Sequence, residues 1–175
     1  AELAQLLQAP VTAHRSGKGI LPDDDPLALP PPAAWQYWQD CDLLIGIGSR
    51  LELQYFRWRW MPKGLKVVRI DIDPTEMVRL KPDVGLVTDS AAGARALIDE
   101  LKGLPARSSR EAELAKLKAD AAHTLTSVQP QEGYLRVIRD VLPRDGFFVE
   151  EVSQVGFTAR MCFPVYAARN YVTCG

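Results

Sequence analysis

The sequence predicts an α/β fold, a mostly parallel sheet flanked by helices, followed by a truncated second α/β domain. Two observations carry this prediction. Strand-like apolar runs alternate with helical patterns over residues 1–103, and the alternation restarts after Pro130. Parallel strands are joined by right-handed crossovers, and ligands bind at the carboxyl ends of such strands. The residues that follow each strand are therefore the first place to look for a site.

In residues 1–103 the apolar runs and their breakers place four strands with helices between them. The expected strands are Val11–His14, Asp42–Gly48, Lys66–Asp73 and Val84–Val87. The second is almost wholly apolar, which is typical of a central strand buried on both faces. Short helices are expected over Glu2–Gln8 and Ala33–Gln39. A longer one should begin at Ser90 as N-cap and stop at Gly103.

After residue 103 the chain is expected to form a connector and then the start of a second domain. The connector, 104–129, contains a charged helix at Arg110–Leu125 with one apolar stripe. Residues 130–175 should add a helix at Glu132–Val141, a strand at Phe147–Glu150, a short helix and a strand at Tyr171–Thr173. The predicted domains are thus 1–103, 104–129 and 130–175. Both ends of the chain are expected to continue in a longer protein.

Composition and charge exclude several classes of protein. Hydrophobic residues make up 47% and charged residues 25%, close to the globular average. The formal net charge of −1 gives no overall positive field for nucleic acid or anionic lipid. No apolar run is long enough to span a bilayer. Three cysteines without C-x-x-C spacing, Cys41, Cys162 and Cys174, argue against a disulfide framework and a zinc site, so a cytoplasmic location is expected.

Two strand ends carry residues suited to a nucleotide. Gly46-Ile47-Gly48 is similar to a dinucleotide-binding turn, but Leu51 occupies the place of the third glycine. The two glycines could equally allow a helix to approach the strand. Asp71 and Asp73 end the next strand, where a carboxylate can accept hydrogen bonds from ribose hydroxyls. The alternative for these acidic residues is to cap the following helix.

Other candidate motifs each have two interpretations. Ser16–Gly19 could bind a phosphate or form a solvated turn, and it lacks the spacing of a Walker loop. Arg57–Trp60 alternates cations and aromatics, which suits either base stacking or contact with a partner domain. His14 and His123 lie far apart in sequence, without a ligand at metal-binding spacing. The residues alone therefore indicate an adenosine-compatible α/β domain without visible catalytic machinery.

Three segments in this order carry a family resemblance: Ser16–Leu27, Cys41–Arg50 and Val68–Glu76. Followed by Val87-Thr88-Asp89 and a helix, they resemble the Rossmann-like central domain of thiamine-diphosphate-dependent enzymes, with the acetolactate synthase branch as the nearest likeness. Residues 142–154 and 171–175 resemble the start of the family's diphosphate-binding domain. The resemblance implies a thiamine-diphosphate- and Mg²⁺-dependent synthase or lyase that acts on a 2-oxo acid.

The resemblance also implies cofactor-binding positions. In the synthase branch FAD passes the segments that match Gly17, Lys18, Gly48, Arg50, Asp71, Asp73 and Asp89, and Gln154 matches a position near the diphosphate. The family's activating glutamate and its Gly-Asp-Gly…Asn metal signature are absent from this sequence. The chain alone is therefore expected to be inactive, with no catalytic and no metal-binding residue.

We expect the longer enzyme to be a homodimer or homotetramer that binds no nucleic acid and no membrane. Two alternatives stay open for this chain: a stand-alone module that binds FAD, ADP or CoA, or a purely structural spacer.

Overall fold

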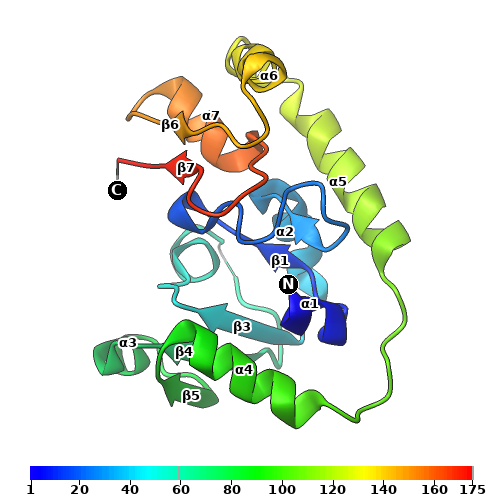
Figure 1. The fold of residues 1–175 in the computed structure, drawn as a ribbon, viewed down its shortest axis with the longest axis vertical. Helices are drawn as coiled ribbons and strands as arrows, with labels where there is room; N and C mark the ends of the chain where they lie inside the picture. The colour runs from blue at the N-terminus through cyan, green and yellow to red at the C-terminus, as the bar shows by residue number, and fades with distance from the viewer. Residues whose placement is uncertain (59, 175) are drawn as a thin grey trace. The chain divides into compact units, whose positions relative to one another are not determined.

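The computed structural model describes residues 1–58 and 60–174 and divides into two compact units. One unit contains Leu3–Gln36 together with the described chain from Arg107 onward, and the other is Tyr37–Ala106. Within the described residues the strands pair in parallel: β1 with β2, β3 with β4, β4 with β5, and β6 with β7 (Figure 1). Helices flank these sheets, which confirms the predicted α/β class.

The Tyr37–Ala106 unit is built on a three-stranded sheet in the order β3, β4, β5. Its strands are β3 (Leu43–Ile47), β4 (Lys66–Asp71) and β5 (Val84–Val87). The helices α3 (Pro74–Arg79) and α4 (Ser90–Leu101) pack on the central strand β4 (Figure 1). Val67 and Ile70 on β4 are buried, so the core of this unit lies along its middle strand.

An aspartate carboxylate caps the N-terminus of each α-helix of this unit. Asp73 Oδ1 accepts from the backbone N–H of Thr75 at 2.8 Å, ahead of Pro74 at the first helical position of α3. Asp89 Oδ1 accepts from Ala91 N at 2.9 Å and from Ala92 N at 3.1 Å. The prediction of Ser90 as N-cap of α4 was therefore wrong by one residue, because the Asp89 carboxylate accepts both of the first free N–H groups.

The apolar strand β3 is less buried than its sequence predicts. Leu43 and Ile47, at its two ends, are 42% and 38% exposed. Val84 and Val87 on the edge strand β5 are also exposed. The expectation that Asp42–Gly48 is buried on both faces was wrong for the described chain, since α3 and α4 cover β4 more fully than its neighbours. The strand itself also ends one residue earlier than predicted.

Two short helices of other types were not expected from the sequence. A 3₁₀ turn, η2 (Trp38–Asp40), continues α2 (Pro31–Tyr37), which begins two residues before the predicted helix. A π-helix, η3 (Leu53–Arg57), follows the loop after β3. Wide π turns are frequent near functional sites, and hydrophobic periodicity does not distinguish them from α-helix.

The N-terminal part of the other unit contains one short parallel pair. After α1 (Glu2–Leu7), the strand β1 (Val11–Thr12) pairs with β2 (Ala28–Leu29), and η1 (Arg15–Gly17) is a 3₁₀ turn between them. β1 is two residues shorter than predicted, and β2 was not predicted. Ala28 and Leu29 are buried, which explains why so short a strand is held in place.

The C-terminal part of the same unit is helical with a second parallel pair. Its elements are α5 (Glu111–Leu125), α6 (Gln131–Val141), β6 (Phe148–Val149), α7 (Gln154–Cys162) and β7 (Tyr171–Val172). The helices agree closely with the predicted ranges, and both strands are shorter. A core cluster joins α6, α7 and β7 through Leu135, Ala159, Phe163, Val165 and Tyr171. Phe148 stacks on Phe163 with ring centroids 4.0 Å apart.

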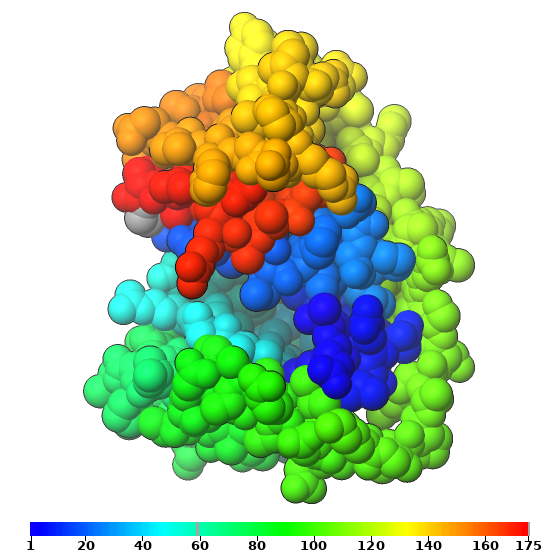
Figure 2. Space-filling model, in the orientation of Figure 1, coloured from blue at the N-terminus to red at the C-terminus, as the bar shows by residue number. Residues whose placement is uncertain are grey.

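The charged helix α5 has one buried and one solvated side, as predicted. Leu114 and Ala121 are fully buried, whereas Lys116 and Asp120 form an exposed ion pair of 2.6 Å. The solvated side of α5, in yellow-green, is visible at the surface in Figure 2. Among the described residues, no helix combines the length and apolar character that crossing a membrane requires.

Candidate functional site

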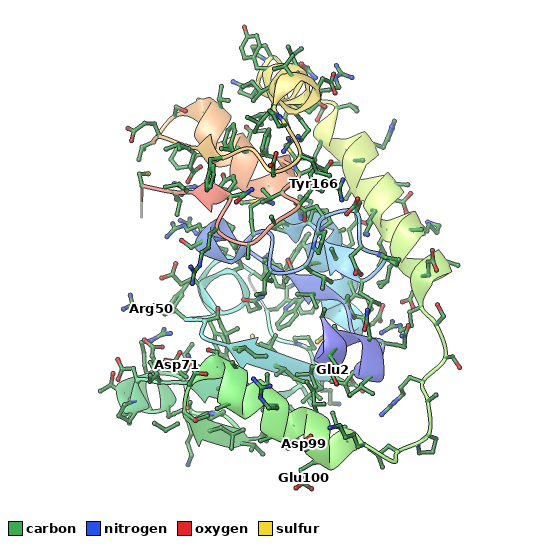
Figure 3. The ribbon with its side chains drawn as sticks, in the orientation of Figure 1. Glu2, Arg50, Asp71, Asp99, Glu100 and Tyr166 are labelled. Carbon is green, nitrogen blue, oxygen red and sulfur yellow. The ribbon has the colours of Figure 1, made fainter. Side chains whose placement is uncertain are left out.

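The carboxyl ends of β3, β4 and β5 meet at one edge of their sheet. Ile47 at the end of β3 is in register with Ile70, and Asp71 at the end of β4 is in register with Val87. Backbone hydrogen bonds continue just beyond the strands, from Gly48 N to Ile70 O at 2.8 Å and from Thr88 N to Asp71 O at 3.0 Å. Five predicted binding residues lie at this edge: Gly48, Arg50, Asp71, Asp73 and Asp89. Figure 3 labels Arg50 and Asp71 there.

Gly48 turns the chain sharply at the end of β3. Its φ of +55° is left-handed, a conformation that favours glycine. A Cβ at this position would lie 3.0 Å from Ser90 Oγ, at the start of α4. The glycine therefore brings the backbone close to the first turn of α4. This supports the structural interpretation of the Gly46-Ile47-Gly48 turn and leaves room for a ligand interpretation as well.

The three aspartates at the edge differ in the hydrogen bonds that their carboxylates accept. Asp73 and Asp89 cap α3 and α4, which supports the capping interpretation of Asp73. Hydrogen bonds from Thr75 lower the pKa of Asp73, so its carboxylate stays ionised. Asp71 is half-buried and accepts one hydrogen bond, from Asp73 N to Oδ1 at 3.1 Å. Within the described residues Asp71 Oδ2 accepts none, so it is the carboxylate best placed to receive a ribose hydroxyl.

The carboxylate of Glu76, on α3, contacts three arginine side chains. Glu76 Oε2 accepts from Arg69 Nη2 at 3.1 Å and from Arg79 Nη2 at 2.6 Å, and Glu76 Oε1 lies 3.4 Å from Arg50 Nε. Arg69 is completely buried on β4 and also donates to Ser49 O at 2.8 Å. The cluster therefore ties the loop after β3 to β4 and α3 through side chains.

The charge state of this cluster is fixed by its hydrogen bonds. Donation from Arg79, with help from Arg69, lowers the pKa of Glu76 to about 2 despite its burial. Arg79 Nη2 also donates to Arg50 O at 2.8 Å. No sequence pattern predicted this cluster of Arg69, Glu76 and Arg79. The available signal was an arginine within a strand of β-branched residues, since a buried cation needs partners nearby.

The remaining predicted residues, Gly17, Lys18 and Gln154, lie in the other unit. Gly17 ends the η1 turn and is exposed, while Lys18 directly after it is buried. Gln154 is the exposed first residue of α7, whose N-cap is Ser153. Their expected contacts with a cofactor stay predictions.

A second buried polar cluster lies at the carboxyl ends of β6 and β7. Glu150 follows β6, and its fully buried carboxylate accepts from Arg160 Nε at 2.7 Å and from the Tyr171 hydroxyl at 3.1 Å. Thr173, after β7, donates to Glu150 Oε1. These bonds fix the two strand ends against α7.

The other sequence candidates have structural partners or fall outside the description. In the tetrapeptide Arg57–Trp60, residue 59 lies outside the described residues. The Trp58 ring is 5.0 Å from the Trp38 ring, and Trp38 Nε1 donates to Trp60 O at 2.9 Å. Among the described residues no group of three histidine, cysteine, aspartate or glutamate side chains is placed to hold a metal ion. The cysteines Cys41, Cys162 and Cys174 are free thiols.

A family comparison accounts for the fold and the order of these motifs. Residues 1–97 match the family model described as thiamine pyrophosphate enzyme, central domain. The chain belongs to this family. Thiamine pyrophosphate is thiamine diphosphate, so the family resemblance predicted from three sequence segments is confirmed.

Known relatives of this central-domain chain are enzymes. It is 30% identical to the probable 2-ketoarginine decarboxylase of Pseudomonas aeruginosa, over 98% of this chain and 32% of the relative. It is 26% identical to the glyoxylate carboligase of Escherichia coli, over 99% of this chain and 32% of the relative. A probable acetolactate synthase large subunit of Methanocaldococcus jannaschii is 34% identical over 58% of this chain and 19% of the relative. The chain spans about a third of the length of the first two.

Proposed function

We propose that this chain works within a thiamine-diphosphate- and Mg²⁺-dependent enzyme that decarboxylates 2-oxo acids or joins them to a second carbonyl compound. The observation that carries the proposal is similarity over nearly the whole chain to a decarboxylase and a carboligase, 98% and 99% of its length. Thiamine diphosphate supplies an electron sink for such chemistry when it is bound. The relatives' names suggest 2-ketoarginine and glyoxylate as the first substrates to test.

Within this enzyme we assign the chain a non-catalytic role. Among the described residues no three His, Cys, Asp or Glu side chains are grouped to hold a metal ion, and we propose that Mg²⁺ and the diphosphate bind elsewhere in the enzyme. The chain instead contributes the parallel sheets and the buried ion clusters around Glu76 and Glu150. We further propose a homodimer or homotetramer in the cytoplasm, where the three free thiols would stay reduced.

The test compares this chain with a longer protein that contains it. Both are purified, and CO₂ release is measured with 2-ketoarginine, glyoxylate and pyruvate, with and without thiamine diphosphate and Mg²⁺. We expect cofactor-dependent turnover by the longer protein and none by the chain alone. Cofactor-independent turnover by either sample, or failure of the longer protein on all three substrates, would contradict the proposal.

A second candidate function is adenine-nucleotide binding at the carboxyl edge of β3–β5. It is favoured by the convergence of Gly48, Arg50 and Asp71 at that edge, with Arg50 largely exposed and Asp71 Oδ2 without a partner among the described residues. The exposed guanidinium suits a diphosphate, and the carboxylate suits ribose hydroxyls. FAD, ADP and CoA share this chemistry.

Calorimetric titration of the chain with ADP tests the nucleotide site, and FAD is titrated in parallel by its visible absorption. Asp71→Ala should weaken ADP binding by roughly tenfold, the value of a charge-assisted hydrogen bond. Asp99→Ala is the matched control, since Asp99 is exposed on α4 and pairs only with Lys102 among the described contacts. Equal affinity of both variants for ADP would rule out the ribose role. Absence of binding to any of the nucleotides would leave the spacer role for this unit.

A further inference from the structure

A small cavity lies within the unit that joins the two ends of the chain. It has a volume of about 220 Å³ and is walled by the loop after η1, by α5 and by the loop after α7. Its lining residues are Lys18, Asp23, Asp24, Pro30, Lys118, Cys162, Pro164 and Tyr166. Figure 3 labels Tyr166. Pockets for drug-sized ligands usually exceed 300 Å³, so this cavity suits a compact molecule.

Direct hydrogen bonds hold the cavity walls together. Asp23 N donates to Val165 O at 3.0 Å, and Val165 N donates back to Asp23 Oδ2 at 2.7 Å. Arg144 Nη2 donates to Asp24 Oδ2 at 2.5 Å. These bonds join the N-terminal loop to the loop before β7 and to the segment after α6. They also engage both aspartates that line the cavity, so the cavity is preformed and its carboxylates already have partners.

Lys18 brings an ammonium group to the cavity on an almost wholly buried side chain, and among the described residues a single carboxylate lies within ion-pair distance of it. Its side chain is 2% exposed, and its nearest described anion, Asp23 Oδ2, is 3.6 Å away. That oxygen already accepts from Val165 N. An ammonium carries three donors, yet Lys18 Nζ makes no hydrogen bond to a described residue, and the Tyr171 ring centroid is 5.8 Å away. A buried cation of this kind is costly unless an acceptor reaches it.

Lys118 adds a second ammonium group from α5. It lies on the buried stripe of the helix, between the fully buried Leu114 and Ala121. Its Nζ donates to Asp25 O at 2.6 Å, which uses one of its three N–H groups. Burial lowers the pKa of Lys118 even though Asp25, Asp23 and Asp24 act to raise it. The neighbouring carboxylates therefore do not fully compensate this charge either.

We propose that this cavity binds a compact oxyanion, a carboxylate or a phosphate, between the ammonium groups of Lys18 and Lys118. The anion supplies acceptors to donors that the described residues leave unused. It would also join segments that are far apart in sequence, so its binding stabilises this unit. The cavity is too small for a dinucleotide and is distinct from the sheet edge at β3–β5, which belongs to the other unit.

The test measures binding of inorganic phosphate and, separately, of acetate to the chain by calorimetry and by thermal unfolding at constant ionic strength. Lys18→Met and Lys118→Met remove one ammonium each and keep an unbranched apolar side chain. Lys116→Met is the matched control, because Lys116 lies on the same helix with its side chain 78% exposed. We expect the wild type and Lys116→Met to bind one of the two anions, and each cavity variant to bind it at least about tenfold more weakly.

The comparison of the two anions identifies the class of ligand. Tighter binding of phosphate indicates a phosphorylated ligand, and tighter binding of acetate indicates a carboxylic acid. If neither anion raises the unfolding temperature of the wild type, or if both cavity variants bind as the wild type does, the proposal is wrong. If Lys18→Met does not fold, the comparison of anion binding by Lys118→Met and Lys116→Met tests the proposal by itself.

Discussion

The Glu76 carboxylate controls how the loop after β3 is held. It neutralises Arg69, which is buried on β4, and it binds Arg79 and Arg50 at the same time. Removing one partner of a buried ion pair leaves the other charged without compensation, which is usually strongly destabilising. The positions of Ser49 and Arg50 at the sheet edge therefore depend on Glu76, which lies on α3.

His14 is the residue from which a pH dependence follows. Its Nε2 is buried and has no hydrogen-bond partner among the described residues. Burial first, then the charges of Arg15, Arg160 and Lys18, lower its pKa from 6.5 to about 4, while Glu150 acts in the opposite direction. The folded protein therefore resists a proton that the unfolded chain accepts below pH 6.5.

We expect His14 to leave the free energy of unfolding almost unchanged above pH 7, to lower it by about 2 kcal/mol between pH 7 and pH 5, and to lower it further down to pH 4. His14→Gln should remove this part of the pH dependence, whereas His123→Gln at an exposed position should not. Urea unfolding of the wild type and of both variants at pH 7 and pH 5 measures this pH dependence. Equal losses in wild type and His14→Gln would show that another group titrates.

Gly93, the smallest residue of α4, allows this helix to pack closely on β4. A Cβ at Gly93 would lie 2.5 Å from Ile70 Cγ2 and 3.0 Å from Thr88 Cγ2. Ile70 is fully buried and cannot move away cheaply. The helical pattern of α4 was predictable from Ala94, Leu97, Ile98 and Leu101. Its close approach at Gly93 was not, because the pattern does not specify what lies opposite a glycine.

Replacing Gly93 by alanine should therefore lower stability although alanine favours helix. Overpacking costs roughly 1–3 kcal/mol and exceeds the helix-propensity gain of about 1 kcal/mol. In Gly133→Ala on α6 the added Cβ would meet only the flexible end of Gln129, at 3.0 Å, so the same change should be neutral or stabilising. Thermal unfolding followed by circular dichroism compares the two variants. A stabilised Gly93→Ala would refute the close packing.

The two compact units of the chain do not follow the order of the sequence. The segment Leu3–Gln36 shares a unit with the described chain from Arg107 onward. Asp23 and Val165 illustrate this grouping, since they form two hydrogen bonds across 142 residues. The division into domains 1–103, 104–129 and 130–175 stays a prediction. The cavity at Lys18 and Lys118 exists only because these distant segments meet.

The α/β class, the family and most helices could be predicted from the amino-acid sequence, because these depend on local periodicity, strand-ending residues and motif order. Sequence patterns also placed Gly48, Asp71 and Asp73 at strand ends, from which their common edge follows by parallel pairing, while Arg50 and Asp89 were expected there only from the family resemblance. Which carboxylates accept hydrogen bonds and which cationic side chains are buried, such as Arg69 and Lys18, became visible only in the folded chain. Those properties depend on side chains from distant segments, and a one-dimensional pattern carries no information about them.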